Sequence, residues 1–303
     1  MAIHAALKPS ESIAAGTTLG TVRLTVSDLT TSRSFYELVL GMSTAECEDG
    51  TLTLGPRGSG QPLLELRADS AAEPVDHRRT GLYHFAILVR TRRDLAAALL
   101  RILRAGWPLQ GASDHLVSEA LYLSDPDGNG IEIYRDRPRP QWPRVGDSIT
   151  MATLPLDLDD LLGELAGGAE LDAARIAAIN DTPLPAGTTV GHVHLQVSDL
   201  RSSEAFYSGV LGFEVTARGY PGALFVSAGG YHHHLGLNTW HSAGAGAPPP
   251  GALGLRSLEV LLPDADSLQR VLARVDCAGF ATERLEHGTL VRDPSGNGVL
   301  LRG

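Results

Sequence analysis

The chain has 303 residues. At about 150 residues per domain this length suggests two domains, each large enough to bury a core without disulfides. Apolar residues make up 43% of the chain and charged residues 20%, and no apolar run approaches the roughly 18 residues that a membrane span needs. The 35 acidic and 25 basic residues leave a net charge of −10, which repels phosphate groups. These values exclude a mini-protein and a membrane-spanning helix, and they disfavour nucleic acid or an anionic membrane as partner.

The N-terminal segment has no apolar core behind a basic start, so it does not resemble a secretory signal, and we expect residues 1–16 to be a disordered tail. Cys47 and Cys277 lie far apart, with no CxxC pair or histidine-rich neighbour, which disfavours a disulfide framework or a cysteine zinc site. A cytoplasmic location is therefore expected. Lys8 is the only lysine and lies in the predicted tail, so the chemistry must come from other side chains.

An internal repeat organises the rest of the chain. The segment from Gly20, GTVRLTVSDLTTSRSFYELVLGM, recurs from Gly191 as GHVHLQVSDLRSSEAFYSGVLGF. A weaker pair is GLYHFAILVRTRRDLAAALLRILRAGWPL from Gly81 and GLRSLEVLLPDADSLQRVLARVDCAGFAT from Gly254, and each of these continues to a turn, DPDGNG or DPSGNG. We name the modules that begin with these four segments A, B, A′ and B′ in chain order.

Each module predicts one strand, one helix and about three further strands. In module A, residues 22–26 alternate as in a strand, Asp28 is a natural helix N-cap, and Gly41 ends the helix. The Phe-Tyr pairs at 35–36 and 206–207 lie at core spacing on the predicted helices. Further strands are predicted at residues 62–68, 119–125, 223–228 and 231–238.

Residues 138–187 break this pattern. The segment begins with the proline- and arginine-rich RPRPQWPR, and residues 157–165 and 171–179 then have the pattern of short helices. We interpret it as a connector between a first two-module domain at 17–137 and a second at 188–303.

The VSDL, FY and VLG signatures and the DPDGNGIEIY ending resemble the vicinal oxygen chelate (glyoxalase/bleomycin resistance/extradiol dioxygenase) superfamily over nearly all of the chain except the tail and the connector. The segments GLYHFAIL, DHLVSEALYLSDPDGNGIEIYRDRP, GHVHLQVSDL and SAGGYHHHLGLNTW resemble CatE-type catechol 2,3-dioxygenases in particular. The resemblance implies an α+β fold in which four βαβββ modules pair into two incomplete mixed-sheet barrels around a divalent metal.

The superfamily places metal ligands on the first and last strands of a module, and the first of them comes seven residues before the helix-capping position. In this register the resemblance assigns His84, His192 and Glu132 as ligands, whereas modules A and B′ offer Thr21 and Ser257. Two histidines and one carboxylate leave open positions on Fe(II) for a diol and dioxygen. Fe(II) is therefore the expected cofactor, with Mn(II) as the alternative.

Neighbouring histidines leave alternatives open. His194 points to the same face of its predicted strand as His192, because strand side chains alternate, and it is a rival ligand. In the predicted strand at 231–238, His233 points to the face opposite His232 and His234. By resemblance to extradiol enzymes His233 is the acid/base that takes the catechol proton. The competing register selects His234, which is also a rival ligand.

His115 resembles a further active-site histidine of the dioxygenases, which hydrogen-bonds bound oxygen or diol, and Tyr122 resembles the tyrosine on the following strand. The spacing from His115 to Glu132 is shorter than in the better-known relatives. An ordinary strand aromatic is therefore the alternative interpretation of Tyr122.

The expected ligands lie in different halves of the chain. Pairing A with B and A′ with B′ would separate His84 and Glu132 from His192 and leave both sites incomplete. Single-domain relatives join a GHVHL-type module to a GLYHLA-type module, so we expect B to pack on A′, either within one chain or across a swapped homodimer. Modules A and B′ would then form a metal-free barrel.

The resemblance implies an extradiol dioxygenase that opens a catechol-type aromatic diol with O₂, as in the catabolism of aromatic compounds. The alternative is a glyoxalase-like metal-dependent isomerase or lyase, which normally uses a second Glu on the strand where the three histidines stand here. A metal-free small-molecule-binding protein of the antibiotic-sequestering kind is the third candidate, and the ligand set argues against it. Neither nucleic acid nor a membrane is expected as partner.

Overall fold

The structure is a computed structural model and describes residues 11–48, 50–146, 148–166 and 183–303. Module A contains β1 (Thr18–Val26), α1 (Leu29–Leu38), β2 (Ser43–Glu48), β3 (Thr51–Gly55) and β4 (Leu64–Ala68). Module B contains β5 (Gly81–Leu88), α2 (Arg92–Arg104), β6 (Gly111–Asp114), β7 (Ser118–Ser124) and β8 (Gly130–Asp136). Each has the predicted order of one strand, one helix and three strands.

The connector contains a 3₁₀ helix η1 (Arg139–Gln141), β9 (Arg144–Val145), β10 (Ser148–Ile149), β11 (Leu154–Pro155) and α3 (Leu158–Ala166). Module A′ contains β12 (Thr189–Gln196), α5 (Leu200–Glu204), a π-helix η2 (Ala205–Val210), β13 (Glu214–Ala217), β14 (Ala223–Ser227) and β15 (Leu235–Asn238). Module B′ contains β16 (Gly254–Leu261), α6 (Ala265–Cys277), β17 (Thr282–Leu285), β18 (Gly288–Arg292) and β19 (Gly298–Arg302). None of the described helices is long and apolar enough to cross a membrane.

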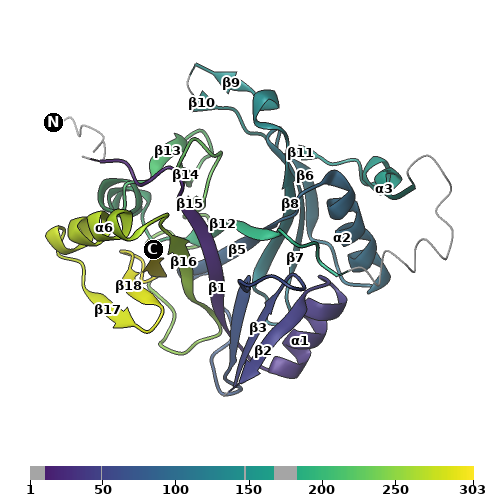
Figure 1. Cartoon of the computed structure of the whole chain (residues 1–303), viewed down its shortest axis with the longest axis horizontal. Coiled ribbons are helices and arrows are strands. Elements are labelled where there is room, and N and C mark those ends of the chain that lie inside the picture. Colours follow the sequence, from purple (N-terminus) through teal and green to yellow (C-terminus); the bar gives the residue numbers. More distant parts are fainter. Residues whose placement is uncertain (1–10, 49, 147, 167–182) are drawn as a thin grey trace.

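The four modules build two large mixed sheets, each from both halves of the chain, which confirms the α+β fold (Figure 1). One sheet has the order β17-β18-β19-β16-β1-β4-β3-β2, and the other has the order β11-β6-β7-β8-β5-β12-β15-β14-β13. The antiparallel pairs β1 with β16 and β5 with β12 join the modules. The expectation that B pairs with A′ is thus confirmed, within one chain. The boundaries predicted at 17–137 and 188–303 separate the two copies of the repeat along the sequence. In the structure, however, each large sheet contains strands from both of these segments.

The recurring FY and DPxGNG motifs hold sequence neighbours together across the two sheets. Tyr36 on α1 is fully buried, and its hydroxyl donates to Asp125 Oδ2 in the turn of module B at 2.9 Å. Tyr207 on η2 donates to Asp293 Oδ2 in the turn of module B′ at 3.0 Å. Module A therefore shares a sheet with B′ but packs its helix on the turn of B, and module A′ shares a sheet with B but packs its helix on the turn of B′.

The β5–β12 ladder contains two bulges beside its histidines. Tyr83 has no partner in the register, since His84 lies opposite His194 and Leu82 opposite Leu195. Gly191 is the extra residue on β12. A Cβ at Gly191 would collide with the hydroxyl of Tyr134, so this bulge requires glycine.

In the A–B′ sheet, ion pairs lie at the part of the β1–β16 ladder that corresponds to the histidines of the β5–β12 ladder. Glu259 is fully buried and accepts the backbone N–H of Thr21 at 3.0 Å. Its carboxylate also lies 3.0 Å from Arg302 and 3.5 Å from Arg23. Arg23 pairs in addition with Glu65 at 3.0 Å. The charges at this place therefore neutralise one another.

Two expectations about local structure are wrong. The strand predicted at 231–238 begins only at Leu235, so the three histidines precede it and do not alternate as strand residues. Residues 11–16 were assigned to a disordered tail, but Ile13 is buried and its N–H donates to Gly212 O at 2.8 Å. The helix predicted at 157–165 is α3, and the one predicted at 171–179 lies outside the described residues.

Because each sheet needs strands from both halves, we expect residues 1–166 and 167–303 to fail to fold when produced separately. The first fragment keeps β11 and α3, which contact β6 and α2. Co-expression should restore a folded heterodimer, measured by size-exclusion chromatography and circular dichroism. A cooperative thermal transition in either isolated fragment would contradict this expectation.

Candidate metal centre and pocket

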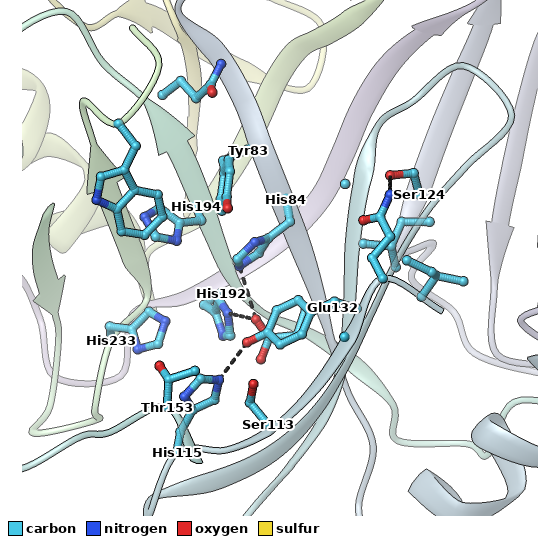
Figure 2. A pocket seen from close by; sticks show the side chains of 18 of the residues that line it. Tyr83, His84, Ser113, His115, Ser124, Glu132, Thr153, His192, His194 and His233 are labelled. Atoms are coloured by element: carbon cyan, nitrogen blue, oxygen red, sulfur yellow. Dashed lines mark hydrogen bonds and ion pairs between the residues drawn. The ribbon is translucent and has the colours of Figure 1, made fainter. Parts of the chain in front are cut away.

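Three side chains from three adjacent strands meet in the B–A′ sheet (Figure 2). Glu132 Oε2 on β8 lies 3.1 Å from His84 Nε2 on β5 and 3.0 Å from His192 Nε2 on β12. One ligand atom from each residue lies within 4.8 Å of the others. The arrangement follows from register, since Ala86 lies opposite both Glu132 in the parallel β5–β8 pair and His192 in the antiparallel β5–β12 pair.

The group is buried, and the pKa shifts of Glu132 and His192 favour the protonation that a divalent cation needs. Burial raises the pKa of Glu132, but the adjacent His192 and His84 outweigh it and hold the pKa well below its usual range. Burial lowers the pKa of His192 and outweighs the attraction of Glu132. His84 Nε2 is buried without a hydrogen-bond partner of good geometry. A carboxylate, a neutral imidazole and an unsatisfied imidazole nitrogen fit a metal ion as their common partner.

These side chains lie in a pocket of about 540 Å³, within the usual range for a small-molecule site. Tyr83, Phe225 and Trp240 form an aromatic wall around His194, with ring centroids 5.2 to 5.6 Å from its ring. His194 lines the pocket but lies outside the three-residue group, and burial lowers its pKa well below the usual range. The position of His194 thus favours a wall residue over a ligand.

His115 and Tyr122 form a hydrogen-bonded pair at the pocket, at 2.6 Å between Nε2 and the hydroxyl. His115 Nδ1 lies 2.6 Å from the carbonyl of Ala152. A carbonyl can only accept, so Nδ1 carries the proton and the Tyr122 hydroxyl donates to Nε2. Burial, and then the charge of Glu132, raises the pKa of Tyr122 well above its usual value. Despite the short spacing, Tyr122 thus faces the pocket as a neutral phenol.

The three consecutive histidines have three different surroundings. His233 lines the pocket, and its ring centroid lies 4.2 Å from that of His192. His232 is fully buried behind it. His234 Nδ1 accepts from the hydroxyl of Ser227 at 2.9 Å, and His234 is not part of the pocket. This arrangement comes from the irregular segment before β15, not from strand alternation, and it separates His233 from the rival His234.

Sequence reasoning did not identify Tyr83, Phe225 or Asp136 as site residues. Strict alternation from His84 turns Tyr83 away from the pocket, and only the bulge at Tyr83 brings both rings to it. Phe225 lies in a strand that is buried throughout, where alternation gives no signal. Asp136 ends β8, four residues after Glu132, and its partner is described below.

Residues 18–133 and 189–301 match the family described as the Glyoxalase/Bleomycin resistance protein/Dioxygenase superfamily. The chain belongs to this superfamily. A curated member from Bacillus subtilis (strain 168), named catechol-2,3-dioxygenase, is 43% identical over 286 residues, which are 93% of this chain and 96% of that protein. The crystal structure of glyoxalase I from Zea mays has the same fold, with a TM-score of 0.56, 17% identity and coverage of 94% of this chain and 92% of that one.

We expect Glu132→Ala to abolish tight metal binding, because two imidazoles alone do not offset the charge of a divalent ion. Metal content after dialysis and isothermal titration with Mn(II) measure the change. Glu65→Gln in the A–B′ sheet is the matched control and should bind metal like the wild type. Retention of a stoichiometric metal by Glu132→Ala would contradict the assignment of this residue.

We expect the metal-free protein to lose stability on acidification. Burial lowers the pKa of His234 from 6.5 to about 4, and it also lowers that of His194. Between pH 6.5 and about pH 4, His234 binds a proton in the unfolded chain but not in the folded chain. Unfolding therefore becomes more favourable as the pH falls. The urea midpoint, measured with a chelator at about pH 7 and about pH 5, should decrease, and His234→Asn should reduce the decrease. Equal midpoints would contradict this expectation.

Proposed function

We propose that this protein is an extradiol dioxygenase, which cleaves the ring of a catechol-type aromatic diol beside the diol with O₂. The observation that carries the proposal is the group of His84, His192 and Glu132 at a pocket, in a chain 43% identical to a catechol-2,3-dioxygenase. One carboxylate and two imidazoles are the set that leaves positions open for a bidentate diol and dioxygen.

His84, Glu132 and His192 would hold Fe(II), with Mn(II) as the alternative. When bound, such a metal supplies sites for both diol oxygens and passes electron density from the diol to dioxygen. All three residues belong to one chain, so a homodimer is not required to complete the site. The fit rests on the buried and unsatisfied Nε2 of His84 and on the ionised Glu132 beside it.

The remaining pocket residues have separate tasks in this proposal. His233, beside His192, accepts a proton from a diol hydroxyl and later returns one. The His115–Tyr122 pair lies on the Glu132 side of the pocket, where the Tyr122 oxygen can accept a hydrogen bond from a diol hydroxyl. Tyr83, Phe225 and Trp240 present an apolar wall to the aromatic ring.

A glyoxalase-like isomerase has less support. That alternative expects a second carboxylate ligand from module A′, whereas the group found among the described residues contains Glu132 alone. A metal-free binding protein would not explain why two imidazoles and a carboxylate, all buried, converge on one point.

We expect anaerobic reconstitution with Fe(II), followed by catechol and air, to give oxygen uptake and a yellow ring-opened product in equal amounts. His233→Phe should retain the metal and bind catechol but lower kcat by about 10²–10⁴-fold, the range for a lost acid/base. Zinc-loaded protein is the control and should consume no oxygen. Loss of metal from His233→Phe would contradict its role, and isomerase activity of the zinc form without oxygen uptake would favour the alternative.

A further inference from the structure

A chain of hydrogen bonds runs away from the pocket behind His233. Nδ1 of His233 lies 2.8 Å from Nδ1 of His232, and Nε2 of His232 lies 2.8 Å from Oδ1 of Asp136. The chain joins the segment before β15 to the end of β8, the strand that carries Glu132. His232 has no exposed surface, and the rings of Tyr231 and Trp142 pack on it with centroids at 4.1 and 5.2 Å.

The direction of each hydrogen bond follows from its acceptor. A carboxylate has only lone pairs to offer, so Nε2 of His232 carries the proton in the contact with Asp136. In a neutral imidazole the other nitrogen is then an acceptor, so the proton between the two histidines belongs to Nδ1 of His233. His233 is thereby left with an unprotonated Nε2. Among the described residues none forms a hydrogen bond with that atom, and His233 lines the pocket.

We propose that Asp136 and His232 are positioning residues that hold His233 in the Nδ1–H tautomer, with Nε2 directed at the substrate as a base. This inference rests on the proposed function. As the diol binds, its O–H bond breaks, a new N–H bond forms at Nε2, and the electron pair stays on the diol oxygen. The opposite tautomer has no lone pair at Nε2 and cannot take this proton. The arrangement has the logic of a triad, in which a carboxylate fixes the tautomer of a catalytic imidazole through a hydrogen bond, here with one further imidazole between them.

A purely structural role is the competing explanation, because the same bonds also tie β8 to the segment before β15. The two explanations differ in what they expect from substitution. A structural tie would affect folding, metal content or KM. A tautomer constraint would affect kcat while leaving these unchanged.

His232→Leu removes the acceptor for His233 and leaves its tautomer free. We expect the Fe(II) enzyme to lose kcat, but by less than the loss of about 10²–10⁴-fold expected for His233→Phe, because the fraction of His233 that keeps the Nδ1–H tautomer stays active, with KM and iron content unchanged. His232→Asn offers an amide oxygen near the place of Nδ1 and should recover most of the lost kcat. His234→Asn is the matched control. The ring of His234 lies outside the pocket, so this substitution should leave kcat at the wild-type value.

Nitrogen-15 NMR of histidine-labelled, metal-free protein tests the tautomer without turnover. The His233 signals are identified by their absence from His233→Phe. We expect a protonated Nδ1 and an unprotonated Nε2 in the wild type, and a mixture of tautomers in Asp136→Ala. A protonated Nε2 in the wild type, or wild-type kcat in His232→Leu, would overturn the inference. A wild-type enzyme that cleaves no catechol would instead count against the proposed function, and the NMR result would still decide the tautomer.

Discussion

The antiparallel pairing of β5 with β12 is the interaction on which the site depends. It places His84 opposite His194 and His192 opposite Ala86, and the parallel neighbour β8 adds Glu132 at the same level. Strands from distant parts of the sequence fix these positions through backbone hydrogen bonds, which are stiffer than loop contacts. The geometry of this candidate metal site therefore follows from the sheet itself.

The two sheets put the same repeat to different uses. Thr21 and Ser257 stand in the A–B′ sheet where His192 and His84 stand in the other, and Glu259 occupies the position of Ala86. The fully buried carboxylate of Glu259 is balanced by arginines and a backbone N–H. Buried charge is tolerated only when it is paired in this manner. In the A–B′ sheet the polar groups therefore pair with one another, whereas in the B–A′ sheet the ligand atoms face a cavity.

Much of this arrangement could be predicted from sequence, because it depends on spacing. The repeat predicted the four modules. The resemblance to the superfamily predicted the pairing of B with A′, because it assigned ligands to both modules and its single-domain relatives join modules of these two types. The bulge at Tyr83 and the irregular path of the three histidines could not be predicted, since both interrupt the alternation on which strand reasoning relies. The partner of His232 was also out of reach, because Asp136 is 96 residues away and only the folded sheet brings it close.

The connector has a consequence that its position between repeats would not suggest. Its Trp142 ring covers His232, its Ala152 carbonyl fixes the proton on His115, and Met151 and Thr153 line the pocket. Segments between domains commonly accept insertions and deletions freely. Here Trp142 and residues 151–153 lie against His232, His115 and the pocket, so an insertion or deletion between them would move groups that border the cavity.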